Sequence, residues 1–133
     1  MDKHQEKLSL IQDLITLSKA DGNIDFIEEN FIKTIASSLG VSEQELNNLK
    51  NNSTAYKPED SETARIIQFY RLLLLMGIDQ KKTLEEINCC KQIALNMGLN
   101  PFAVNATIEQ FLNSKTGMMT PDSVIKIFQV QHN

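Results

Sequence analysis

The feature that most constrains this chain is a pattern of acidic and apolar residues that occurs twice. The first copy is the stretch ADGNIDFIEENFIKTIASSLGV, residues 20–41. Its Asp-Gly-Asn turn at 21–23 precedes Asp25 and Glu28, which have the spacing of a capping box at the start of a helix. Apolar residues then recur every three or four positions up to a glycine, as in a helix with one buried face. The stretch therefore predicts a turn followed by an amphipathic helix.

The same pattern returns 58 positions later, where Asp21 aligns with Asp79 and Glu28 with Glu86. The apolar positions of the two stretches align as well, and both helical patterns end at a glycine. Because acidic and apolar positions match together, the pattern indicates an internal duplication.

We expect one compact all-α domain, 1–133, because 133 residues suit a single core and no stretch alternates with the period of a strand. Two repeats are too few for an open solenoid, which needs about three. The expected architecture is a bundle of about seven helices built from two pseudo-symmetric halves, about 1–55 and 58–133. The periodicity and capping signals predict helices over 2–19, 25–39, 43–50, 58–76 and 84–96, a sixth from 100–101, and a seventh after 120–122.

The first predicted helix, 2–19, has an apolar face that repeats at helical spacing. Its charged residues Asp2, Lys3, Glu6 and Lys7 are expected on the solvated side. The fourth predicted helix is apolar around much of its circumference, which is typical of a helix buried by several neighbours.

Charge and composition exclude several classes of function. A formal net charge of −4 argues against a nucleic-acid-binding surface, which needs a basic patch. The longest apolar run, 72–76, is far short of the roughly 20 residues that span a bilayer, so no transmembrane segment is expected. The N-terminus lacks the pattern of a signal peptide, which makes the cytoplasm the expected location. The adjacent Cys89 and Cys90 align with apolar positions of the first copy and are expected to be small core residues.

Three interpretations of the acidic residues stay open. Residues 21–28 match positions five to twelve of an EF-hand loop, but Leu17 and Lys19 stand at positions one and three, where that loop needs carboxylates. The same residues are also what helix caps and the helix dipole require. Alternatively, the duplication brings the two helix starts together, and a hard divalent cation binds among their carboxylates. In that case the predicted metal ligands are Asp21, Asp25, Glu28, Asp79 and Glu86, and the predicted cation is Ca²⁺ or Mg²⁺.

A helix ending in ADG, an acidic helix start, IAxxLG and a degenerate second copy ending in IAxxMGL together resemble the tellurite-resistance protein B (TerB-like) family. The resemblance covers about 8–111. It implies an all-helical, duplicated fold and a cytoplasmic bacterial protein linked to stress responses and tellurite resistance. It also implies an acidic patch associated with a divalent metal, and a binding or scaffolding role near membrane complexes. By position, the motif residues are Asp21, Glu28, Asp79 and Glu86.

No catalytic activity is expected. His4 and His132 lie near the two ends of the chain, where helices fray, and no nucleophile motif or phosphate-binding glycine loop is present. The alternative function is binding of an apolar small ligand, a lipid or a partner helix, with the acidic residues serving only as caps. Such a pocket would be lined by the helix around 72–76 with Phe69, Phe102, Met118 and Met119.

Overall fold

The computed structural model describes residues 3–20, 22, 25–52, 54, 56–78, 83–114 and 119–132. Every regular element within these ranges is a helix. They are α1 (Lys3–Ser18), α2 (Phe26–Ser38), α3 (Glu43–Asn51), α4 (Glu62–Ile78), α5 (Leu84–Asn96), α6 (Pro101–Asn113) and α7 (Pro121–His132). The predicted all-α fold of seven helices is thereby confirmed for the described residues.

The boundaries of α4 differ from their prediction. The proline and acidic residues at 58–60 predicted a start at 58, but the helix begins at Glu62. Ser61 caps it, because its hydroxyl accepts a hydrogen bond from the Ala64 N–H at 3.0 Å. At the other end, α4 continues through Gly77, which was expected to end it. A glycine inside a helix costs about 1 kcal/mol relative to alanine but does not forbid the helix.

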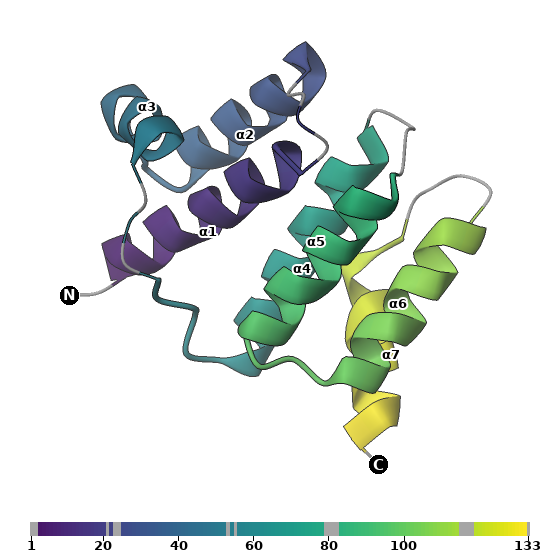
Figure 1. Ribbon diagram of the computed structural model, residues 1–133. Coiled ribbons are helices and arrows are strands. Elements are labelled where there is room, and N and C mark those ends of the chain that lie inside the picture. Colours follow the sequence, from purple (N-terminus) through teal and green to yellow (C-terminus); the bar gives the residue numbers. More distant parts are fainter. Residues whose placement is uncertain are drawn as a thin grey trace.

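Helices α1 and α4 form the centre of the molecule (Figure 1). α1 packs against α2, α3, α4 and α5, whereas α4 packs against α1, α2, α5 and α7. α6 lies farther out, on α5 and α7. The N-terminal helices thus cover one side of the α1–α4 pair, and the C-terminal helices cover the other.

The duplicated stretches have the same local structure. α2 and α5 each have 13 residues. Each is followed by a glycine of positive φ, Gly40 at 79° and Gly98 at 84°. The next residue in each copy donates its N–H back into the helix, from Val41 to the Ala36 carbonyl at 2.9 Å and from Leu99 to its repeat equivalent at 3.2 Å. Only glycine adopts this left-handed turn without steric cost, which explains why both copies end in one.

Contacts between the two halves are reciprocal. α1 packs against α5, and α2 packs against α4. A twofold axis that exchanges α1 with α4 and α2 with α5 would turn the first of these contacts into the second. α7 has no counterpart in the first half. The contacts agree with the expected pseudo-symmetry, which stays a prediction, as do the single domain 1–133 and its halves 1–55 and 58–133.

The core is filled mainly by large apolar side chains from α1 and α4, joined by residues of the other helices. Phe69 of α4 is 0% exposed, and its ring meets that of Phe128 of α7 edge to face at a centroid distance of 6.1 Å. This is a preferred geometry for aromatic pairs. The contact fixes α7 on the centre of the bundle.

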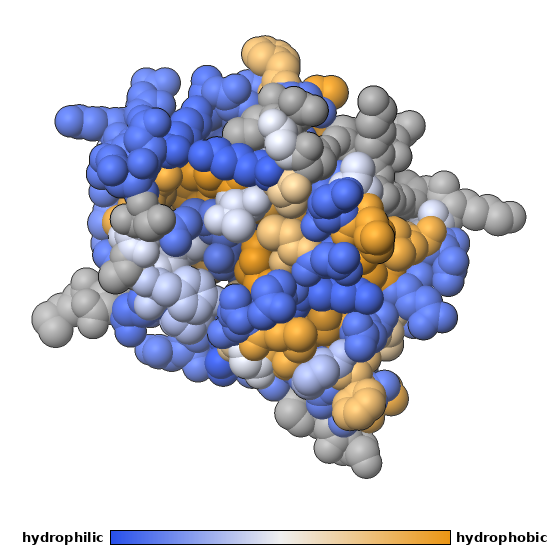
Figure 2. Space-filling view, in the orientation of Figure 1, coloured by the Kyte–Doolittle hydropathy of each residue, from blue (hydrophilic) through white to orange (hydrophobic). Residues whose placement is uncertain are grey.

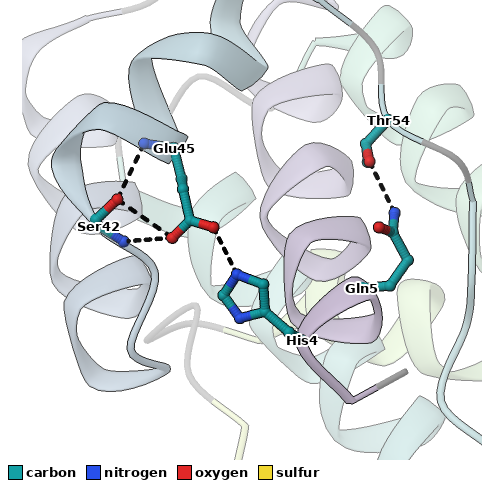
Figure 3. Close-up of polar contacts among 5 residues, drawn as sticks. All are labelled: His4, Gln5, Ser42, Glu45 and Thr54. Carbon is teal, nitrogen blue, oxygen red and sulfur yellow. Dashed lines mark hydrogen bonds and ion pairs between the residues drawn. The ribbon is translucent and has the colours of Figure 1, made fainter. Parts of the chain in front are cut away.

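Side-chain bonds join the start of α1 to the α3 region (Figure 3). His4 Nε2 lies 2.5 Å from Glu45 Oε2, so His4 is held in place and is not a frayed end. Glu45 also completes the predicted capping box with Ser42. The hydrogen bond from His4, followed by that from the Ser42 backbone, lowers the pKa of Glu45. Beside this pair, Gln5 Nε2 donates to Thr54 Oγ1 at 2.7 Å.

Replacing Phe69 tests the position of the core. Phe69→Ala should lower the free energy of unfolding by about 3–5 kcal/mol, because it deletes a fully buried ring and leaves a cavity. Phe102→Ala is the matched control, since Phe102 is 74% exposed and its loss should change stability by less than about 0.5 kcal/mol. Chemical denaturation of both variants measures the difference. If the two variants lose the same stability, the placement of Phe69 in the core is wrong.

Candidate functional site

The structure describes three of the five predicted metal ligands. Asp25 and Glu28 lie at the start of α2, and Glu86 lies at the start of α5. Asp21 and Asp79 lie outside the described residues. The complete five-residue site therefore stays a prediction.

The described acidic residues take part in helix capping. Asp25 is the N-cap of α2, and its Oδ1 accepts a hydrogen bond from the Glu28 N–H at 2.8 Å. Thr83 caps α5 in the same way, accepting from the Glu86 N–H at 3.1 Å. The Thr83 N–H in turn donates to Glu86 Oε1 at 3.4 Å, which completes the predicted capping box. The capping interpretation is thereby confirmed for Asp25 and Glu86, whereas the described cap of α2 uses only the backbone N–H of Glu28.

Glu28 and Glu86 are buried as well as duplicated. Each is the third residue of its helix and only 2% exposed. A carboxylate in such a place is costly unless hydrogen bonds, cations or the helix dipole stabilise it. Since cap carboxylates are usually solvated, this burial sets the two positions apart from Glu45, the capping glutamate of α3.

Figure 1 shows α2 and α5 beginning at the same end of the molecule, uppermost in that view. Within the described ranges, no three His, Cys, Asp or Glu side chains are placed so that they could hold a metal ion. A shared cation site would therefore need Asp21 and Asp79. The EF-hand interpretation finds no support, because Leu17, at the first loop position, lies inside α1 and is 0% exposed.

A second group of polar residues lies buried between α1 and α4, and the sequence did not predict it. Glu6 was expected on the solvated side of α1, but it is only 6% exposed. Ser9 and Asp13, at 1% and 8% exposed, lie on the same face one and two turns further along. The prediction for Glu6 was wrong because it rested on residue type alone and assumed that a charged side chain faces solvent. The spacing of three and four residues between these polar groups was the available signal.

Gln68 of α4 is the centre of this polar layer. It is 0% exposed, and its Nε2 donates to the Leu10 carbonyl of α1 at 3.0 Å. Arg71 Nη1 donates to Gln68 Oε1 at 3.3 Å. Burial raises the pKa of Asp13 to about 7, and a hydrogen bond with Gln68 offsets part of this rise. A carboxyl with this pKa gains or loses its proton near neutral pH.

Glu59 extends the layer toward the connection before α4. Burial raises the pKa of Glu59, and the charge of Glu6 and a hydrogen bond with Glu6 raise it further. Arg71 opposes this rise, and burial lowers the pKa of Arg71 itself.

The cysteines are core residues, as expected. Cys90 is 0% exposed and Cys89 is half-buried; both thiols are free. Burial raises the pKa of both, and for Cys89 the charges of Asp13 and Glu86 add to the effect. A thiol with a raised pKa is a poor nucleophile near neutral pH, because only the thiolate reacts.

These observations define the class of protein: an all-helical bundle in which two helices, α2 and α5, have acidic first turns and the same local structure. Residues 1–51 match the family model described as Tellurite resistance protein TerB. The match spans α1, α2 and α3, and it supports the predicted resemblance to the TerB family over this part of the chain. No curated protein and no solved structure shows significant similarity to the chain.

Removing one cap measures what the acidic helix starts contribute without a metal. Thr83→Ala should lower the free energy of unfolding by about 1 kcal/mol, because it leaves a first-turn N–H of α5 without its acceptor. Thr34→Ala is the matched control, since the exposed Thr34 hydroxyl only bonds the Asn30 carbonyl within α2. Denaturation in the presence of a chelator compares the two. If both variants lose the same stability, the capping box contributes nothing specific.

Proposed function

We propose that the chain is a non-enzymatic binding or scaffolding module of a bacterial, tellurite-resistance-like stress response, and that it works in the cytoplasm. The observation that carries this proposal is the match of residues 1–51 to the TerB family. The duplicated acidic helix starts support it, because they give the module two equivalent positions at one end of the bundle.

The environment of the reactive side chains favours a module over an enzyme. His4 pairs with Glu45, which is itself occupied in a helix cap. Cys90 is enclosed in the core, and burial holds its pKa high. In each case the side chain stabilises the fold.

The proposed ligand is a hard divalent cation, Ca²⁺ or Mg²⁺, held by carboxylate oxygens of both helix starts. Asp25, Glu28 and Glu86 supply part of the donor set, and Asp21 and Asp79 complete it. The burial of Glu28 and Glu86, 2% exposed each, supports this proposal, since buried carboxylates in proteins are paired, hydrogen-bonded or bound to metals. The cation would neutralise the acidic end and order the surface that a partner meets.

The partner is proposed to be a protein of a membrane-associated complex, as the family resemblance implies. None of the helices in the described ranges is long and apolar enough to cross a membrane.

Exposed apolar side chains favour a second candidate function, binding of a partner helix. Figure 2 shows hydrophobic side chains at the surface over the α5 and α6 side of the molecule, between hydrophilic ones. Leu84 and Leu95 of α5 are 68% and 40% exposed, and Phe102 of α6 is 74% exposed. Phe69 and Phe102 do not line a common apolar pocket, as one expectation had it, because Phe69 is buried in the core while Phe102 faces solvent. Met119 packs partly buried against the core, and Met118 lies outside the described residues.

A thermal melt of chelator-treated protein tests the cation. Millimolar Ca²⁺ or Mg²⁺ should raise the melting temperature by several degrees, since a ligand at 100 times its dissociation constant adds about 2.7 kcal/mol. The rise should disappear in the double variant Glu28→Gln/Glu86→Gln and in Asp21→Asn/Asp79→Asn. The matched control Glu43→Gln/Glu85→Gln changes two exposed first-turn glutamates and should keep the rise.

Two results would contradict the cation site. One is a melting temperature that no divalent cation changes. The other is a rise that persists in both double variants. In either case the partner-helix function gains support, and Phe102→Ser should then reduce binding of a hydrophobic dye to the native protein.

A further inference from the structure

Residues 56–61 lie over the polar face of α1. The Lys57 N–H donates to Ser9 Oγ at 2.8 Å. Ser9 stands between Glu6 and Asp13 on that face, so the bond places the segment beside both carboxyls. Pro58 follows at once, and a residue before proline is held extended, which keeps Lys57 out of a helix of its own. Within the described residues, the Lys57 N–H thus supplies the hydrogen bond that joins this segment to α1.

The segment meets the two α1 carboxyls through its own titratable groups. Glu59 lies against Glu6, as described above. Tyr56 lies near Asp13, whose charge, after burial, helps raise the pKa of the Tyr56 phenol to about 12. Covering the α1 face therefore brings acidic groups together in a region with little water.

The other polar, titratable and charged groups around these carboxyls come mainly from α4 and α5. Arg71 and Gln68 of α4 face Glu59 and Asp13, respectively, and Arg65 of α4 acts on Tyr56. From α5, Cys89 lies near Asp13. Asp60, within the segment, adds a further negative charge beside Glu59. Among the residues that the structure describes, Arg71 is the positive charge acting on Glu59, and it is itself partly buried.

We propose that residues 56–61 form a proton-sensitive cover over the polar face of α1. The cover is closed while the Asp13 carboxyl is neutral. It loosens when Asp13 ionises, because water reaches this carboxyl only when the segment lifts. Opening exposes Ser9, Gln68 and the carboxyls between the two central helices. This device is independent of the proposed cation and partner.

The direction of the pH effect follows from the Asp13 carboxyl. Its pKa is about 7 with the cover closed and approaches the ordinary 3.8 once water reaches it. Between these values the closed form holds a proton that the open form has lost. Opening therefore becomes up to about tenfold more favourable for each pH unit in this window, and above about pH 7 the effect levels off.

Amide hydrogen exchange by NMR tests the cover. The protection factor of the Lys57 amide should fall as the pH rises from about 5 to 7 and then level off, while that of Ile108, buried in α6, serves as the reference. In the variant Asp13→Asn/Glu59→Gln, Lys57 should keep nearly constant protection over this range. Asn and Gln imitate the protonated carboxyls, so the closed form is retained. Each single substitution should remove part of the pH dependence.

The matched control is Asp122→Asn/Glu109→Gln, which makes the same two chemical changes at exposed sites of α7 and α6. This control should show the pH dependence of the wild type. Constant protection of Lys57 in the wild type would overturn the proposal. So would a loss of protection that is as steep in the Asp13→Asn/Glu59→Gln variant as in the control.

Discussion

The buried bond from Gln68 to the Leu10 carbonyl is the constraint on which the arrangement of the helices depends. It joins α1 to α4 where both are inaccessible to water, and Asp13 lies beside it. A buried polar group left without its partner costs about 1–3 kcal/mol, so sliding α1 along α4 by one turn would be penalised at several groups at once. Apolar contacts alone tolerate such a slide more easily, because one leucine replaces another. The polar layer thus fixes the register of the two central helices, and the remaining helices pack on them.

The position of the candidate site follows from that register. α2 begins shortly after α1 ends, and α5 begins shortly after α4 ends. Since α1 and α4 run toward the same end of the bundle, both acidic helix starts lie at that end (Figure 1). Glu28 and Glu86 are buried there because each is the third residue of a helix that packs against the opposite central helix. The fold therefore accounts for the common location of the acidic starts, whereas their use as a cation site remains the proposal.

Local signals made much of the fold predictable. Caps and glycines located both ends of α2 and α5, because each cap satisfies N–H groups of its own first turn and needs no distant partner. The start of α4 was misplaced because the residues from Pro58 onward are also suited to a helix start, and only the fold shows that they pack on α1. The burial of Glu6 and the raised pKa of Asp13 were not predictable from residue type. Glu6 lies against Glu59, and the Asp13 pKa is raised by burial under elements that only the fold brings together. The same holds for the candidate site, for which the sequence predicts residues but not the distances between them.

The most direct test of this account is a carbon-13 NMR titration of the Asp13 side-chain carboxyl in the wild-type protein. If α1 and α4 enclose Asp13 beside Gln68, its chemical shift should change with a midpoint near pH 7, the value to which burial raises its pKa. The exposed carboxyl of Asp122 in the same spectrum is the internal comparison. A midpoint for Asp13 near its ordinary value of 3.8 would mean that water reaches it freely, and the buried polar layer would then be wrong.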